Sequence, residues 1–191
     1  KRADAQFQRE VAIKVLREQS ADWRLRFARE RELLASLEHP HIASLLDAGI
    51  TQTGLSYIVM PWLAGANFSS WCQSAKGLQN AKSPSLSAAE KLSRFVGLVD
   101  AVAYAHQRLV IHRDLKPNNI RSDASGQLQL LDFGISALLE APEQTEENLP
   151  CKATLNVLTP SYASPEQLSG EAASTLSDVH GLGLLLFELL L

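Results

Sequence analysis

The stretch His112-Arg113-Asp114-Leu115-Lys116-Pro117-Asn118-Asn119 decides how the rest of this sequence is interpreted. It follows the apolar run Leu109-Val110-Ile111, so its polar side chains stand on a loop directly after a buried segment. Within it, a carboxylate and an amide are joined in the spacing Asp-x-x-x-x-Asn, with a lysine between them. This density of reactive side chains predicts a loop that carries chemistry.

Three further motifs lie in a fixed order around this stretch. Lys14 stands upstream in Val11-Ala12-Ile13-Lys14, Asp132-Phe133-Gly134 follows downstream, and Ser164-Pro165-Glu166 comes last. The set resembles the signature of the eukaryotic-type protein kinases. The residues within the motifs resemble those of the bacterial serine/threonine kinases in this family. A single triplet is weak evidence, but four motifs in this order over the whole chain are specific.

The resemblance implies an α+β, two-lobed protein-kinase-like fold that is truncated at both ends. Residues 1–61 are expected to form a partial β-rich N-lobe with one helix, residues 62–66 a hinge, and residues 67–191 a partial helical C-lobe. The first glycine is Gly49, so the family's glycine-rich phosphate loop is expected before Lys1. The helices that complete the C-lobe are expected after Leu191, because the chain ends inside an apolar run.

Local patterns predict the elements of this fold. Strands are expected at residues 11–16, 44–50, 55–60 and 128–131, with a turn at 51–54, and a helix at 21–37. Ser87 and Glu90 form a capping box that opens a helix through His106. Its inward face is expected to hold Leu92, Phe95, Val96, Val99, Val102 and Ala103. Residues 182–191 are expected to form a buried core helix.

The composition limits which binding partners and which cellular compartment are expected. The chain has 191 residues, a net charge of −3, 46% hydrophobic and 20% charged residues, and two cysteines. This balance gives no reason to expect nucleic-acid binding, and the longest apolar run is too short to span a membrane. With Cys72 and Cys151 far apart, a reducing compartment is the simpler interpretation. The cytoplasm, or the cytoplasmic portion of a membrane-anchored parent protein, is therefore expected.

The resemblance also implies roles for the polar residues, in a reaction that transfers the γ-phosphate of ATP to Ser or Thr hydroxyls of a protein. Asp114 would orient the substrate hydroxyl, and Lys116 would contact the γ-phosphate. Lys14 would hold the α/β-phosphates. Asn119 and Asp132 would bind Mg²⁺, with Mn²⁺ as an alternative, because hard cations prefer oxygen ligands.

Two further roles are left with alternatives. Glu30 is expected to pair with Lys14, because it shares the inward helix face with Phe27 and Leu34, and Glu32 is its rival. Thr159 is expected to contact Asp114 from the substrate-binding loop, and the alternative is a plain turn residue.

Met60-Pro61-Trp62-Leu63 resembles the hinge that contacts adenine. Met60 would be the gatekeeper, the backbones of Pro61 and Leu63 would face the base, and Ala12 would line the same pocket. Arg121 departs from the family, which usually has an apolar residue beneath adenine there. An arginine at that point either swings out or disturbs the pocket. If Arg121 faces the adenine pocket, an unpaired cation there would cost desolvation, and Arg121→Leu is then expected to bind ATP equally well or better. A loss of affinity would instead indicate a productive contact of Arg121.

Supporting residues follow from the same resemblance. Asp178 is expected to hold the catalytic loop backbone, or simply to be a charge at a helix N-terminus. Glu166 is expected to be buried and ion-paired. Regulation is expected through Arg113 and self-phosphorylation in trans of an activation-loop threonine. The candidate hydroxyls are Thr145, Thr154 and Thr159, and the side chains expected to stack between the lobes are Leu34, His112 and Phe133.

Three functional interpretations stay open on the sequence alone. The first is a catalytic kinase, because Lys14, Asp114, Asn119 and Asp132 are all retained. The second is a pseudokinase that binds nucleotide or acts as a scaffold, which only Arg121 supports. The third is a small-molecule phosphotransferase of related fold, against which Lys116 and the Ser-Pro-Glu motif argue.

Overall fold

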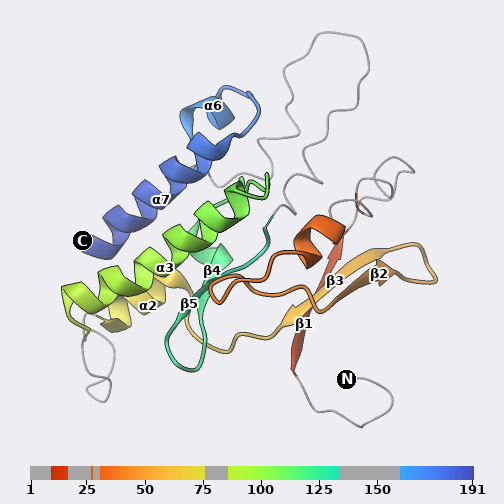
Figure 1. The fold of residues 1–191 in the computed structure, drawn as a ribbon, viewed down its shortest axis with the longest axis horizontal. Coiled ribbons are helices and arrows are strands. Elements are labelled where there is room, and N and C mark those ends of the chain that lie inside the picture. Colours follow the sequence, from red (N-terminus) through yellow and green to blue (C-terminus); the bar gives the residue numbers. More distant parts are fainter. Residues whose placement is uncertain (1–9, 17–26, 28–30, 76–85, 134–159) are drawn as a thin grey trace.

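The computed structural model describes residues 10–16, 27, 31–75, 86–133 and 160–191 (Figure 1). Within this part, an antiparallel sheet in the order β1-β3-β2 forms from β1 (Val11–Leu16), β2 (Asp47–Ile50) and β3 (Ser56–Pro61). The strands predicted at 11–16 and 55–60 are confirmed. β2 is shorter than the predicted strand at 44–50, although the N–H of Leu46 still donates to the carbonyl of Val59 in β3 at 2.8 Å.

Local signals account for the turn between β2 and β3. Gly54 has a φ of 85°, a conformation that glycine adopts without steric cost. The N–H of Thr51 donates to the carbonyl of Leu55 at 2.8 Å and closes the turn. The predicted turn at 51–54 is therefore confirmed.

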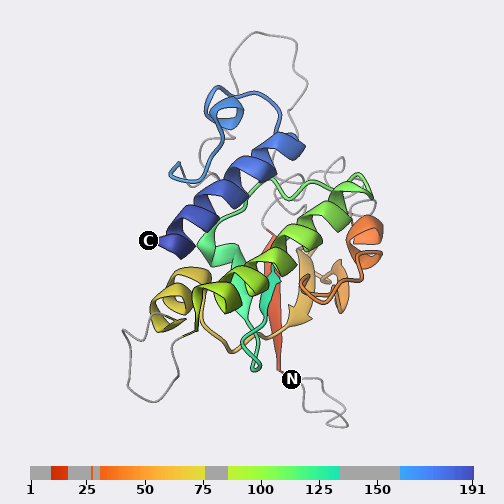
Figure 2. The same ribbon diagram turned by 60° about the vertical axis from the view of Figure 1, so that its left-hand side comes forward.

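The helical part of the chain packs on a small two-stranded sheet (Figures 1 and 2). Helix α3 (Ala88–His106) lies along α7 (Thr175–Leu190) and contacts strand β5 (Leu128–Leu130). Helix α2 (Phe68–Ala75) packs against α7 and against β4 (Ile120–Ser122), which pairs with β5. The fully buried side chains at the centre are Phe68, Leu98, Ile120, Leu128, Leu130 and Leu185. The mixed α+β architecture agrees with the predicted fold class.

Helix α3 begins where the sequence predicts, but its buried face differs. Ser87 and Glu90 form the capping box, with the N–H of Ser87 donating to Glu90 at 2.8 Å. Phe95 and Val102 are buried as predicted, together with Leu98. The other predicted inward residues, Leu92, Val96, Val99 and Ala103, are exposed, so that part of the prediction is wrong. The helix carries two apolar stripes, and contact with β5 and α7 buries only one of them.

Helix α7 is likewise buried on one side only. Leu182, Leu185 and Leu189 are buried, whereas Phe187 and Leu190 are more than half exposed, which corrects the expectation of a wholly buried helix. Near its start, a Cβ at Gly181 would lie only 2.8 Å from Cβ of Leu115. Gly181 therefore lets α7 approach the loop at residues 110–116 closely.

Candidate active site

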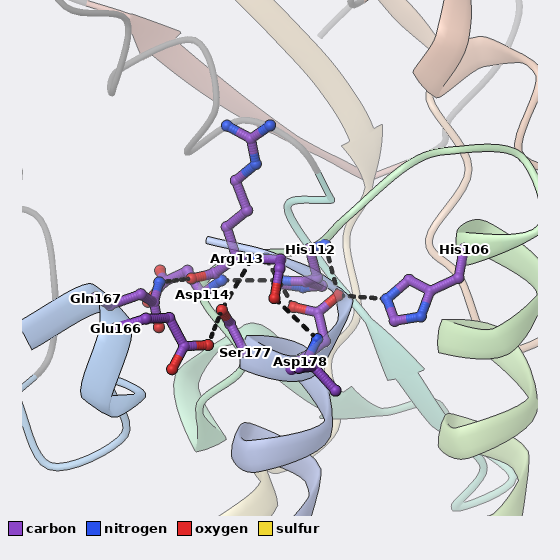
Figure 3. A network of polar contacts seen from close by, with 10 residues as sticks. His106, His112, Arg113, Asp114, Glu166, Gln167, Ser177 and Asp178 are labelled. Atoms are coloured by element: carbon purple, nitrogen blue, oxygen red, sulfur yellow. Dashed lines mark hydrogen bonds and ion pairs between the residues drawn. The ribbon is translucent and has the colours of Figure 1, made fainter. Parts of the chain in front are cut away.

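The loop between α3 and β4 is fixed by one buried carboxylate from another helix. Asp178, in the first turn of α7, is 1% exposed. Its Oδ2 accepts the N–H of His112 at 2.9 Å and lies 2.7 Å from Nε2 of His106, and its Oδ1 accepts the N–H of Arg113 at 2.9 Å (Figure 3). The predicted role of Asp178 in holding this loop is confirmed. The alternative interpretation of Asp178, a charge at a helix N-terminus, is also correct, because Asp178 lies in the first turn of α7.

Three of the predicted site residues meet at the end of this loop. Nζ of Lys116 lies 2.7 Å from Oδ2 of Asp114. The side-chain amide of Asn119 donates to the backbone carbonyl of Asp114 at 2.8 Å and to its Oδ2 at 3.0 Å. The 3-10 turn η1 (Pro117–Asn119) brings Asn119 back to Asp114, and Pro117 at its first position favours that turn. The carboxylate of Asp114 is therefore held by a cation and an amide.

Lys14 and Asp132 form a second pair between the two parts of the fold. Lys14 lies on β1, and its Nζ is 2.9 Å from Oδ2 of Asp132, which follows β5. Asp132 has a φ of 59°, an uncommon conformation for a residue other than glycine. Its Oδ1 is buried and has no hydrogen-bond partner among the described residues. The site therefore contains one carboxylate oxygen that lacks a donor within the described part of the chain.

Aromatic stacking links the loop to the residue after Asp132. The ring centroids of His112 and Phe133 are 4.6 Å apart, and Nε2 of His112 lies 2.9 Å from the carbonyl of Leu131. Leu34 lines the same small cavity as Phe133 and Met60. The predicted stack of Leu34, His112 and Phe133 agrees with these contacts.

The residues predicted to contact adenine lie at the end of β3: Met60 and Pro61 are its last two residues, and Trp62 and Leu63 follow it. Met60 is buried and pairs across the sheet with Ala12, and Pro61 pairs with Val11. The N–H of Trp62 donates to the carbonyl of Glu10 at 3.3 Å. Met60 and Ala12 therefore lie side by side at the end of the sheet from which the chain leaves toward α2.

Arg121 is not an unpaired cation, so the condition for the expected desolvation cost is not met and the alternative of a productive contact holds. Its Nη1 donates to the carbonyl of Leu63 at 2.9 Å, and its Cζ lies 5.5 Å from the ring centroid of Trp62. The residues after the hinge run against β4, where the N–H of Ser122 donates to the carbonyl of Ala66 at 3.0 Å. Arg121 thus fastens the hinge to the two-stranded sheet.

Glu166 is half-buried rather than buried, which corrects the prediction. Oγ of Ser177 donates to its carboxylate at 2.6 Å, and among the described residues Glu166 forms no ion pair. The hydrogen bond from Ser177 is the main reason that the pKa of Glu166 lies below its usual value. The contact joins α6 (Pro165–Leu168) to α7.

Two predicted site residues, Glu30 and Thr159, lie outside the described residues, as do Thr145 and Thr154. Glu32, the rival of Glu30, is exposed. Sequence reasoning missed Gln167, whose side chain donates to the carbonyl of Arg113 at 2.7 Å. The capping box of Ser164 and Gln167 was visible in the sequence, but a cap predicts no contact with a distant loop.

Comparison with known proteins identifies the architecture. The family model described as "Protein kinase domain" matches residues 1–191. The chain belongs to the protein kinase domain family. It is 38% identical to the serine/threonine-protein kinase PrkC of Bacillus subtilis over 95% of this chain and 26% of that protein. It is 34% identical to the serine/threonine-protein kinase PknB of Mycobacterium leprae over 98% of this chain and 29% of that protein.

Solved structures agree with this family. The crystal structure of the Mycobacterium tuberculosis PknI kinase domain has a TM-score of 0.63 at 28% identity, covering 94% of this chain and 62% of that chain. The chain therefore spans between a quarter and a third of the curated relatives and about three fifths of the solved kinase domain. The α+β kinase fold is confirmed.

The donor set of this kinase domain fits a hard divalent cation. The unpartnered, buried Oδ1 of Asp132 is a carboxylate oxygen of the type that Mg²⁺ prefers. Among the described residues, no group of three or more His, Cys, Asp or Glu side chains could hold a metal by itself. Magnesium in phosphotransfer sites is bound through one or two carboxylates together with substrate phosphates, so a cluster of three such protein side chains is not required.

Replacing Asp178 should weaken the kinase fold. Asp178→Ala leaves the N–H groups of His112 and Arg113 without an acceptor, and we expect the free energy of unfolding to fall by about 3–5 kcal/mol. Asp123→Ala is a matched control, because Asp123 also accepts three hydrogen bonds, from the N–H and Oγ of Ser125 and the N–H of Gln127, but at the surface. It should cost about 1 kcal/mol. Urea unfolding followed by fluorescence measures both, and equal losses would contradict the assignment.

Replacing Arg121 should weaken nucleotide binding, the reverse of the result expected for an unpaired cation. Arg121→Leu frees the carbonyl of Leu63, and we expect ATP affinity to fall about threefold to tenfold, the equivalent of one net hydrogen bond of roughly 0.7–1.4 kcal/mol. Arg108→Leu is the control: Arg108 also donates to a backbone carbonyl and lies 3.6 Å from a ring centroid, that of Tyr104. Titration calorimetry with ATP and Mg²⁺ measures both variants. Unchanged affinity in Arg121→Leu would show that the contact does not support the hinge.

Proposed function

We propose that this chain is the catalytic part of a bacterial serine/threonine protein kinase, which transfers the γ-phosphate of ATP to Ser or Thr hydroxyls of protein substrates. One observation carries the proposal: the chain brings two carboxylates, two lysines and an amide together in two sets, Lys14 with Asp132, and Lys116 with Asp114 and Asn119. Phosphoryl transfer needs this combination of positive charge, metal-binding oxygen and an oriented base.

The proposed mechanism assigns each side chain one task. Asp114 holds the substrate hydroxyl and accepts its proton as the new O–P bond forms and the bond between the β- and γ-phosphates breaks, which releases ADP. Lys116 contacts the γ-phosphate, and its Nζ lies 2.7 Å from that carboxylate. Lys14 holds the α/β-phosphates. Mg²⁺, or Mn²⁺ in its place, supplies charge neutralisation when held by Asn119 and Asp132.

The remaining assignments complete this proposal. The hinge at 62–66 divides a lobe of residues 1–61 from one of residues 67–191, and adenine binds beside Ala12, Met60, Pro61 and Leu63. Glu30 pairs with Lys14 once Asp132 binds metal, and the exposure of Glu32 favours Glu30 over its rival. Thr159 positions the substrate hydroxyl beside Asp114.

Partners and location follow from the same reasoning. The partner is a protein with a Ser or Thr acceptor, including a second copy of the kinase that is phosphorylated in trans on its activation loop. No nucleic acid is expected to bind. No helix in the described part of the chain is long and apolar enough to cross a membrane. We propose that the kinase works in the cytoplasm, or as the cytoplasmic portion of a membrane-anchored protein.

One experiment separates the three candidate functions. The intact protein is incubated with ATP labelled in its γ-phosphate, Mg²⁺ and a basic test protein, and phosphorylated residues are located by mass spectrometry. Label on Ser or Thr supports the proposal. ATP binding without any transfer identifies a pseudokinase, and transfer only to small hydroxyl compounds identifies the related phosphotransferase. Either of these two results would overturn the proposed function.

A further inference from the structure

Gln167 links two parts of the fold through the two ends of one side-chain amide. It lies on α6 and is 4% exposed. Its Oε1 accepts hydrogen bonds from the N–H and the hydroxyl of Ser164, both at 3.1 Å, which forms half of the capping box of α6. Its Nε2 donates to the backbone carbonyl of Arg113 at 2.7 Å. A buried amide with partners at both ends is held in one orientation.

The residue that receives this bond has an unusual backbone. Arg113 has a φ of 69°, the left-handed region that side chains other than glycine seldom adopt. Such a conformation costs free energy and persists only where the surroundings fix it. Here the N–H of Arg113 donates to Asp178 on α7, while its carbonyl accepts from Gln167 on α6. Figure 3 shows the two contacts on the backbone of Arg113, whose side chain points away from them.

The carbonyl of Arg113 belongs to the peptide bond that leads into Asp114. Because that peptide is planar, fixing its carbonyl oxygen also fixes the nitrogen and the Cα of Asp114. The side chain of Asp114 therefore starts from a backbone position that α6 and α7 determine together. Lys116 holds only the far end of that side chain, whereas Asn119 contacts both its Oδ2 and the backbone carbonyl on the other side of Asp114.

We propose that Gln167 is a positioning residue that sets the backbone of Asp114 by holding the carbonyl of Arg113. The inference rests on the proposed function, in which Asp114 orients the substrate hydroxyl. Losing the bond releases one side of a left-handed residue next to the reacting carboxylate. A displacement of about 1 Å at such a point lowers turnover by on the order of 100-fold. Nucleotide binding depends on Lys14 and the hinge, so it is unaffected.

Two variants of the intact protein and one control test this proposal. Gln167→Glu keeps an oxygen for the two donors of Ser164 but has no N–H for Arg113, and Gln167→Met removes both contacts. The control is Glu90→Met, because Glu90 accepts the N–H and the hydroxyl of Ser87 at 2.8 and 2.7 Å in the same capping geometry, without any contact to the loop. The measurements are kcat and KM for ATP, and the hydrogen-exchange rate of the Arg113 amide without nucleotide.

We expect kcat to fall on the order of 10- to 100-fold in both Gln167 variants, with KM for ATP within about twofold of the parent. The Arg113 amide should exchange faster in both, and Glu90→Met should change neither quantity. If folded Gln167→Glu has the parental kcat and the parental exchange rate of the Arg113 amide, the proposal is overturned. If Gln167→Met does not fold, Gln167→Glu alone tests the proposal. If the parent itself transfers no phosphate, the proposed function fails, and amide exchange alone decides whether Gln167 holds the loop.

Discussion

Asp114→Ala in the intact protein is expected to lower phosphate transfer by on the order of 10²–10⁴-fold while ATP still binds. The carboxylate can both orient a hydroxyl and accept its proton, and Lys116 and Asn119 hold it from two sides. Truncation therefore removes the base and also releases Lys116 from its partner. Neither change touches the hinge or Lys14, so nucleotide binding should persist.

The measurement compares initial rates of phosphorylation with ATP affinity in the same samples. Asp114→Asn separates two parts of the effect, because it keeps the shape and a hydrogen-bonding oxygen but cannot accept the proton. It should be nearly as slow as the alanine variant. Asp123→Ala, which removes a carboxylate far from the site, should keep the parental rate. If Asp114→Ala phosphorylates a protein substrate at the parental rate, the assignment of the base is wrong.

Lys14→Met is expected to raise the ATP requirement and to lower transfer together, with kcat/KM falling on the order of 10²–10³-fold. The ammonium group is the positive charge that β1 contributes to the site, and its Nζ lies 2.9 Å from the carboxylate of Asp132, which we propose binds the metal. Methionine has a similar length but no charge. The variant also leaves the carboxylate of Asp132 without its cation.

Steady-state kinetics over a range of ATP concentrations test this prediction. Lys91→Met serves as the control, because Lys91 lies on α3, away from β1 and Asp132, and should leave both parameters unchanged. A rise in KM with an unaltered kcat would mean that Lys14 binds ground state and transition state equally. An unaltered kcat/KM would contradict its proposed role.

Several elements were predictable because their causes are local. The branched residues of β1, the Gly54 turn and the capping box of Ser87 and Glu90 each depend on neighbours within a few positions. The site motifs were visible for a different reason, since their order along the chain matches a family. Asp114, Lys116 and Asn119 could also be expected together, because a short loop and one 3-10 turn connect them.

Contacts between distant segments were predictable only where the family resemblance supplied them. It supplied the contact of Asp178 with the loop, although its alternative as a helix N-terminal charge could be resolved only in three dimensions. It gave no contact for Gln167, and for Arg121 it suggested an unpaired cation. Arg121 instead lies 2.9 Å from a carbonyl that is 58 positions away in sequence.

The sequence by itself determined β1, β3, the turn at 51–54, the cap of α3, and the identity and order of the reactive residues, because these depend on side-chain chemistry and short-range spacing. The tertiary structure decided which stripe of α3 is buried, that Lys14 meets Asp132, that Arg121 binds the hinge, and that α6 and α7 hold Arg113 from two sides. Both stripes of α3 are apolar, and both ends of Gln167 can form hydrogen bonds. The choice among such equivalent partners is made only when packing brings one of them within reach.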